Sequence, residues 1–235
     1  MEIEELKNLI DKSRKIVFFG GAGVSTESGL KDFRGNKGLY SESFYDYKPE
    51  EVLSSTFLYN NPKVFYEYYR KNFITKGIKP NDAHYYLAEL EKKGKDITII
   101  TQNIDGLHQL AGSKNVIELH GSIYRNYTVN TKRNFEGIDH ILKAEGIPYD
   151  ENGEMIRPDV TLYGEMLNQE VLNKAIKALR NADLLIVGGT SLTVYPAANL
   201  INYYSGEEMI AINRDYIPIR NFIKGNIGEI FKQLR

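Results

Sequence analysis

The chain of 235 residues contains no cysteine and no tryptophan, and it has only four histidines. The missing thiols exclude disulfides, thiolate nucleophiles and every cysteine-based metal site. Three of the histidines, His84, His108 and His140, lack the spacing of metal ligands, so we expect them to be structural or exposed. A chain without cysteine is compatible with a reducing compartment, and we expect it in the cytoplasm.

An excess of one charge is also missing. Thirty basic and 31 acidic side chains leave a formal charge of −1, which favours neither nucleic acid nor an anionic membrane as a partner. No apolar run approaches the roughly 20 residues that a membrane-spanning helix needs, and the acidic first residues lack the apolar core of a signal peptide. The 42% hydrophobic and 26% charged residues are typical of a globular protein and argue against disorder.

Short apolar runs alternate with helical patterns along much of the chain. Strands are predicted at residues 15–19, 96–101, 116–119, 183–189 and 209–213, the last of these being the last clear strand. Helices are predicted at residues 2–13, 81–93, 168–180 and 196–204. This alternation predicts an α/β protein with a doubly wound parallel sheet, Rossmann-like, and helices on both of its faces.

Two segments do not follow this alternation. Residues 36–80 are rich in tyrosine and phenylalanine and contain prolines, which favours short helices and loops, whereas residues 121–157 are polar and loop-like. We therefore expect a single domain over residues 1–235 with a smaller inserted module. The Rossmann-like part is expected at about 1–35, 81–122 and 158–235, and the small module at about 36–80 and 123–157.

The first predicted strand runs into a glycine-rich turn, in which residues 21–26 read GAGVST. Two glycines spaced as G-x-G let backbone N–H groups approach a pyrophosphate. Thr26 occupies the position where the dinucleotide fingerprint has Gly or Ala, so the turn alone is equally compatible with any doubly wound fold. The polar stretch that follows ends in Phe33-Arg34, and a ring beside a cation suits a heteroaromatic group next to phosphate.

These residues resemble the opening signature of the sirtuins, which are NAD-dependent protein lysine deacylases. Residues 21–25 read GAGVS and residues 32–35 read DFRG. Further matches follow in the family's order: TQNIDGLH at 101–108, ELHGS at 118–122, Arg157-Pro158 with YGE at 163–165, GTSL at 189–192 with Pro196-Ala197, and Ile212-Asn213. The matches span roughly residues 20 to 213, which is most of the chain.

The resemblance implies a reaction in which the acyl oxygen of a modified lysine attacks C1′ of the nicotinamide ribose as nicotinamide leaves. A base then activates a ribose hydroxyl, and the products are nicotinamide, O-acyl-ADP-ribose and free lysine. His120 is the implied base, because a neutral imidazole can accept a proton near neutral pH. Asp105 would hold the nicotinamide carboxamide together with the Ile104 backbone, and Asn103 completes the catalytic set.

The same resemblance implies the remaining binding roles. Gln102 and Asn103 would bind ribose hydroxyls, and Phe33 would cover the vacated ribose face. The pyrophosphate side would be held by Gly21, Ala22, Gly23, Thr26 and Arg34. The adenosine half would be held by Gly189, Thr190, Ser191, Asn213 and the Ile227 backbone. The acyl-lysine protein or peptide would lie in a groove between the two modules and contact Thr161 through its carbonyl, Tyr163 and Val194.

Each of these residues also has an ordinary structural interpretation. His120 could be a structural histidine, Asp105 a helix N-cap, Arg34 a surface ion-pair partner, and residues 188–191 only a turn. At the functional level, a mono-ADP-ribosyltransferase or an NAD glycohydrolase shares the C1′ chemistry. A non-enzymatic NAD or acyl-lysine sensor would not need His120. A dehydrogenase is disfavoured by the incomplete fingerprint, although Arg214 leaves a small opening for NADP.

Two departures from the family are visible. Thr128 and Thr131, and Tyr149 and Asn152, stand where most sirtuins carry two Cys-x-x-Cys pairs for a structural zinc. Neutral hydroxyl and amide groups are poor zinc ligands, so we expect no metal. The small module would instead be held by apolar residues, with a short helix over 135–142. These residues are Val129, Phe135, Ile138, Ile141, Leu142 and Ile147.

The second departure concerns the acyl group. Sirtuins that prefer succinyl or malonyl lysine have a tyrosine and, three residues later, an arginine. Tyr69 can match the tyrosine, but Asn72 follows at that distance, and Arg70 and Lys71 are out of register on a regular helix. An aromatic helix that only packs on the core, with its basic residues in solvent, would have the same sequence pattern. We therefore expect acetyl or another uncharged acyl group.

Overall fold

The computed structural model describes residues 1–32, 38–41, 43–74 and 77–235. Its larger part is built on a six-stranded sheet in the order β3-β2-β1-β7-β8-β9, and all five pairs are parallel. The strands are β1 (Lys15–Gly20), β2 (Asp96–Thr101), β3 (Val116–Glu118), β7 (Leu184–Gly188), β8 (Glu208–Asn213) and β9 (Asn221–Lys224). The predicted strands and the predicted doubly wound parallel sheet are confirmed.

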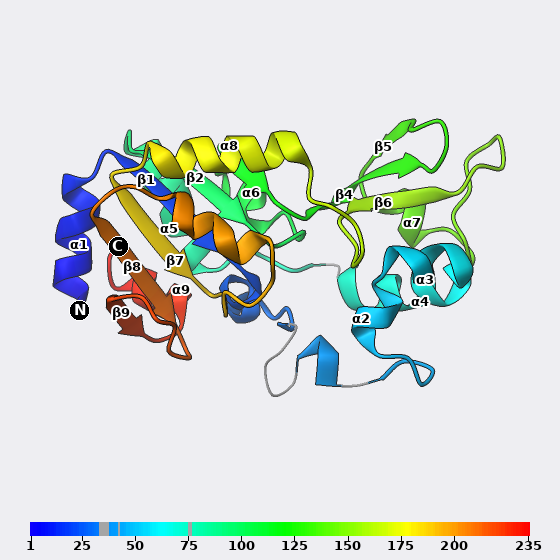
Figure 1. The fold of residues 1–235 in the computed structure, drawn as a ribbon, viewed down its shortest axis with the longest axis horizontal. Helices are drawn as coiled ribbons and strands as arrows, with labels where there is room; N and C mark the ends of the chain where they lie inside the picture. Colours follow the sequence, from blue (N-terminus) through cyan, green and yellow to red (C-terminus); the bar gives the residue numbers. More distant parts are fainter. Residues whose placement is uncertain (33–37, 42, 75–76) are drawn as a thin grey trace.

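The central strands bury side chains on both faces of this sheet. Ile16 and Phe18 of β1 pack toward α1 (Ile3–Lys12), α5 (Asp82–Lys92) and α9 (Ile227–Lys232). Val17 and Phe19 point to the opposite face, which is covered by α8 (Gln169–Arg180) and η4 (Ala197–Tyr203). Figure 1 shows these helices around the sheet, with both chain termini in this part. The two-sided burial explains why these strands read as continuous apolar runs.

Local signals in the sequence account for the helix starts. Asn81 caps α5, because its side-chain oxygen accepts the Ala83 N–H at 2.9 Å, and Asn168 caps α8 in the same way. The predicted helix at 196–204 forms as the 3₁₀ helix η4 rather than an α-helix. Residues 209–213, predicted as the last clear strand, form β8, and one further strand, β9, follows. That strand is short, lies at the sheet edge and contains Asn221 and Lys224, so it lacks a continuous apolar run.

The smaller part contains a three-stranded antiparallel sheet in the order β5-β4-β6. Its strands are β4 (Gly121–Thr128), β5 (Asn134–Glu136) and β6 (Ile156–Val160). Residues 121–157 were expected to be loop-like, and this expectation is wrong, because a sheet with one solvated face carries polar residues at alternate positions. Strand β4 begins at Gly121 and β6 ends at Val160, so both strands extend beyond the bounds of 123 and 157 that were expected for the small module. The division of the chain into two parts stays a prediction.

The aromatic segment forms short helices, as the sequence predicts, and these helices cover the small sheet. They are α2 (Pro49–Val52), α3 (Ser55–Asn60) and α4 (Pro62–Phe73), joined by α7 (Asp139–Leu142), and they lie together in Figure 1. Phe65, Tyr66 and Tyr69 of α4 are fully buried and pack with Ile141 and Ile156. The helix expected over 135–142 forms only as α7, since residues 134–136 form β5.

Hydrogen bonds connect Thr128 and Thr131, the first pair of positions where zinc ligands would stand. The Thr128 and Thr131 hydroxyls are 2.7 Å apart, and the Thr131 hydroxyl donates to Glu154 Oε2 at 2.7 Å. The Arg133 N–H donates to Thr128 Oγ1 at 2.8 Å. Within the described ranges, no group of three or more His, Asp or Glu side chains is arranged to hold a metal ion. The absence of zinc stays a prediction.

None of the helices in the described part of the chain combines the length and apolar character needed to cross a bilayer.

Candidate active site

A cavity of about 430 Å³ lies where the carboxyl ends of the parallel strands meet the small part. Open α/β sheets bind ligands at this edge, next to the position where the strand order reverses. The predicted site residues that line it are Gly21, Ala22, Gly23, Gln102, Asn103, Ile104, Asp105, His120, Thr161, Tyr163, Gly189, Thr190, Ser191, Val194, Asn213 and Ile227. Phe33 and Arg34 lie outside the described residues.

The turn after β1 approaches the end of β7 so closely that side chains are excluded. The Gly23 N–H donates to the Gly189 carbonyl at 2.8 Å, and a Cβ on Gly23 would come within 2.8 Å of Gly189. A Cβ on Gly21 would meet Thr190 at 2.9 Å. Thr26 does not line the cavity; its hydroxyl donates to the Gly23 carbonyl at 3.0 Å and closes the turn. The glycines therefore bring two strand ends together around a space that a phosphate group can enter.

Asp105 lies in the loop after β2 and is hydrogen-bonded to the turn after β1. Its Oδ2 accepts the Ser25 hydroxyl at 2.6 Å, and its Oδ1 accepts the Leu107 N–H at 2.9 Å. Asn103 Nδ2 donates to Ser25 Oγ and to the Gly21 carbonyl, both at 3.1 Å. Burial raises the pKa of Asp105, and the Ser25 and Leu107 hydrogen bonds oppose that rise. The site therefore presents a buried carboxylate with both oxygens already oriented.

His120 has a defined tautomer. Its Nδ1 lies 2.9 Å from the Gln102 carbonyl oxygen, which can only accept, so Nδ1 carries the proton and Nε2 keeps its lone pair. Burial lowers the pKa of His120, and the hydrogen bond to Gln102 partly opposes this. The His120 carbonyl accepts the Thr161 N–H at 2.9 Å. A neutral imidazole of this kind can take a proton from a hydroxyl near neutral pH.

The other end of the cavity joins β7, β8 and α9. Gln102 Nε2 donates to Thr190 Oγ1 at 3.1 Å, which links the ends of β2 and β7. Arg214 follows Asn213 and pairs with Asp32, with Nη2 and Oδ2 2.7 Å apart. Glu27 accepts the Gly228 N–H at 2.7 Å and so fixes the helix that begins at Ile227. This end is lined by polar groups from elements far apart in the sequence.

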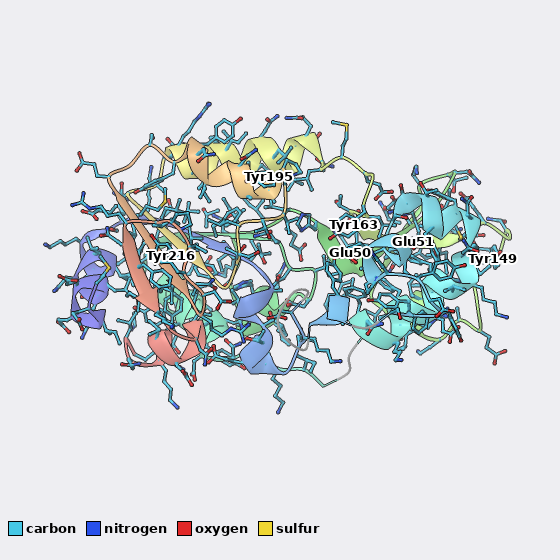
Figure 2. The ribbon with its side chains drawn as sticks, turned by 60° about the horizontal axis from the view of Figure 1, so that its bottom comes forward. Glu50, Glu51, Tyr149, Tyr163, Tyr195 and Tyr216 are labelled. Atoms are coloured by element: carbon cyan, nitrogen blue, oxygen red, sulfur yellow. The ribbon has the colours of Figure 1, made fainter. Side chains whose placement is uncertain are left out.

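The segment after β6 forms the wall next to the small part. Arg157 is buried, and its Nη1 lies 2.6 Å from Glu165 Oε1; Glu165 Oε2 also accepts the Leu162 N–H at 2.9 Å. Burial alone lowers the pKa of Arg157, but the Glu165 carboxylate raises it above its ordinary value. Tyr163 lies at the junction of the two parts in Figure 2. The ion pair therefore fixes the segment that carries Thr161 and Tyr163.

On helix α4, Asn72 and not its basic neighbours lines the cavity. Asn72 lies next to Tyr69 and Phe73 in the cavity wall, and its Nδ2 donates to the Tyr68 carbonyl at 2.9 Å. Arg70 Nε instead donates to the Ile141 carbonyl at 2.7 Å, below the small sheet. The wall formed by α4 is thus aromatic and neutral, in agreement with the register expected from the sequence.

Several lining residues were not predicted from the sequence. They are Ser25, Asp32, Tyr40 and Asp215, whereas Asn72 and Arg214 were considered in the sequence for acyl choice and for NADP. Ser25 and Asp32 lie within the motifs that carry the family resemblance, so the motifs themselves were a signal that the hydroxyl and the carboxylate deserve a role. Tyr40 and Asp215 follow no motif, and only the folded chain places them at the cavity.

Comparisons with known proteins agree with this geometry. The sequence model of the Sir2 family matches residues 21–196. A Clostridium acetobutylicum protein named NAD-dependent protein deacetylase is 49% identical over 238 residues, covering 98% of this chain and 97% of that protein. A Clostridium tetani protein of the same name is 52% identical over 218 residues, covering 92% of this chain and 88% of that protein.

Solved structures are similar over the whole chain. A Sir2 structure with a deacetylated p53 peptide and 3′-O-acetyl ADP-ribose has a TM-score of 0.90 at 36% identity, and the match covers 100% of this chain and 97% of that one. A Sir2 structure with p53 peptide and NAD⁺ has a TM-score of 0.87 at 38% identity, with the same coverage of 100% and 97%.

Proposed function

The chain belongs to the Sir2 family, and we propose that it is an NAD-dependent protein-lysine deacylase whose main substrate is acetyl-lysine. The observation that carries this proposal is the arrangement of two groups in one cavity. The Gln102 carbonyl fixes the tautomer of His120 and burial favours its neutral form, while Ser25 orients the Asp105 carboxylate. Both line the cavity between the strand ends and the small part.

NAD supplies the ADP-ribose group that receives the acyl group, and nicotinamide leaves. In this proposal Asp105 accepts hydrogen bonds from the nicotinamide carboxamide, and His120 Nε2 takes the proton of a ribose hydroxyl. Gln102 and Asn103 orient the ribose. Gly21 and Gly23 border the space for the pyrophosphate, and Thr190 is assigned to the adenosine half. One water is consumed when the lysine amine leaves, and the products are nicotinamide, O-acyl-ADP-ribose and free lysine.

The acyl-lysine peptide is proposed to enter beside Thr161 and Tyr163. The Thr161 N–H is already bonded to the His120 carbonyl, so this residue lies directly beside the base and can offer its own carbonyl to the substrate amide. The aromatic, neutral wall at Tyr69 and Asn72 supports an uncharged acyl group. A cytoplasmic location is part of the same proposal, because a chain without cysteine needs no oxidising compartment to fold.

Mass spectrometry of acetyl-, succinyl- and longer acyl-lysine peptides incubated with NAD tests the function. We expect deacetylated peptide and O-acetyl-ADP-ribose in equal amounts, and neither with His120→Ala. Nicotinamide release without peptide would identify a glycohydrolase instead, and ADP-ribose attached to protein would identify an ADP-ribosyltransferase. A His120→Ala enzyme as active as the parent would remove the imidazole from the mechanism.

A further inference from the structure

Two tyrosine hydroxyls meet at the rim of the cavity. Tyr40 and Tyr163 are 123 residues apart in the sequence, and their hydroxyl oxygens are 2.6 Å apart. Tyr40 lies in the 3₁₀ turn η3 (Leu39–Ser41), and Tyr163 lies in the segment after β6. Both rings line the cavity. The hydroxyl pair therefore joins two walls that are otherwise separate elements of the fold.

The backbone on each side of this pair is anchored independently. The Tyr163 N–H donates to the Leu53 carbonyl at 3.0 Å, and the Tyr163 carbonyl accepts the Ser55 N–H at 2.9 Å. These two bonds attach Tyr163 to the α2–α3 connection of the small part. The segment is therefore held in place before the hydroxyl makes any contact, and the direction of the Tyr163 ring is restricted.

The other tyrosine is tied to the nucleotide end of the cavity. The Leu39 N–H, next to Tyr40, donates to the Asp32 carbonyl at 2.8 Å, and the Asp32 carboxylate pairs with Arg214 at the end of β8. A continuous series of contacts thus runs from Arg214 to Tyr163 along one side of the cavity. Tyr40 packs against the apolar core of the small part, so the series enters the small part at the bond between Leu39 and Asp32, and the tyrosine pair then connects η3 to the segment after β6.

We propose that the Tyr40–Tyr163 hydroxyl pair positions the acyl-lysine side chain by setting the distance between η3 and the segment that carries Thr161. This inference rests on the proposed function and adds to it a positioning role for Tyr40 and for the hydroxyl of Tyr163. Thr161 is bonded to the His120 carbonyl and lies two residues before Tyr163, so the hydroxyl pair places η3 next to the segment that borders the base. Tyr163→Phe would keep the aromatic ring in the cavity lining and remove only the hydrogen bond to the Tyr40 hydroxyl.

Steady-state kinetics with Tyr163→Phe and Tyr40→Phe tests the pair. We expect each variant to raise the KM for acetyl-lysine peptide about threefold to tenfold, the effect of losing one hydrogen bond. The kcat and the KM for NAD should change less than about twofold, because no reacting group is removed. The double variant should match either single variant, since both changes remove the same bond. Additive effects, or a loss in kcat instead of KM, would overturn the proposal.

Hydrogen–deuterium exchange gives a readout that does not depend on activity. Residues 39–41 should exchange faster in both phenylalanine variants than in the parent protein. The matched control is Tyr149→Phe, which removes an exposed tyrosine hydroxyl at the far end of the small part and should change nothing (Figure 2). A parent protein without deacylase activity would refute the proposed function, while unchanged exchange in both variants would refute this inference alone.

Discussion

The Ser25 hydroxyl donates a 2.6 Å hydrogen bond to Asp105 Oδ2 and so connects the turn after β1 with the loop after β2. Ser25 is almost completely buried, and its oxygen also accepts the Asn103 amide at 3.1 Å. Ser25 thus donates to the carboxylate and accepts from the amide at the same time. This one hydroxyl therefore contributes to the orientation of both Asp105 and Asn103, which are also bonded to the Leu107 N–H and the Gly21 carbonyl.

Replacement of Ser25 by alanine should therefore reduce catalysis without unfolding the protein. A hydrogen bond to a charged group is lost, so we expect kcat/KM for deacetylation to fall about 10- to 100-fold. Steady-state assays with acetyl-lysine peptide measure this, with Ser205→Ala as the control because Ser205 bonds only the distant Arg180 carbonyl among the described residues. An unchanged kcat/KM in a folded Ser25→Ala enzyme would show that Asp105 needs no such orientation.

The environment of His120 predicts the acidic limb of the pH profile. Burial lowers the pKa of His120 below its ordinary value of 6.5, and the base must be neutral to act. Deacetylation should consequently be retained as the pH falls to 6.5 and be lost only at lower pH. The pH dependence of kcat/KM measures this limb, and exposed His140→Gln should leave it in place. A limb centred above pH 6.5 would mean that another group controls the rate.

A buried histidine pair should make stability depend on pH. The rings of His84 and His108 are 4.6 Å apart, and burial lowers the pKa of His84 to about 4. The unfolded state binds the proton near pH 6.5, so this contribution is fully present above 6.5 and decreases as the pH falls toward 4. For His84 alone the loss is about 3 kcal/mol.

Urea unfolding at several pH values between 7.5 and 4.5 measures this loss. His84→Gln is the informative variant, because glutamine can still accept the Asn81 N–H of the capping box but does not titrate. As the pH falls, the free energy of unfolding should decrease less in this variant than in the parent. Titration of His108 accounts for the decrease that remains. Equal slopes in parent and variant would exclude His84 as the titrating group.

The hydrogen bonds of Glu154 should stabilise the small part without a metal. The Thr131 hydroxyl lowers the pKa of Glu154, so this contribution is present above the ordinary carboxyl pKa and is lost as the pH falls through the lower folded value. Glu154→Gln should lower Tm by about 2–4 °C at neutral pH, and exposed Glu145→Gln should not. A chelator should leave the parent Tm unchanged. One equivalent of zinc in the purified protein would contradict the assignment.

Position 72 should influence the choice of acyl group. Asn72 lines the cavity three residues after Tyr69, where sirtuins with a preference for acidic acyl groups have an arginine. Asn72→Arg should raise the ratio of desuccinylation to deacetylation about tenfold or more, because a guanidinium can pair with the succinyl carboxylate. Competition assays with both peptides measure the ratio, with Lys71→Arg as a control. An unchanged ratio would place the acyl end elsewhere.

The sequence alone predicted the elements whose signals are local. Strand β1 and the glycine turn after it are contiguous, and Asn81 precedes the helix that it caps. Apolar runs identified the strands that are buried on both faces, because these strands cannot accept polar residues. The order of the motifs also placed His120 and Asp105 in one site before any geometry was known.

Other features depended on how distant segments pack. Strands β4 and β9 are partly solvated, and β6 is buried but contains Arg157 and Asp159. Polar residues therefore interrupt all three patterns and hide these strands from a search for apolar runs. The Ser25–Asp105 bond joins residues 80 positions apart, and the Tyr40–Tyr163 pair joins residues 123 apart. Periodicity reports only which face of an element is buried. Which side chains then meet across the cavity is decided when the two sheets and their helices pack together, because that packing fixes the distances between them.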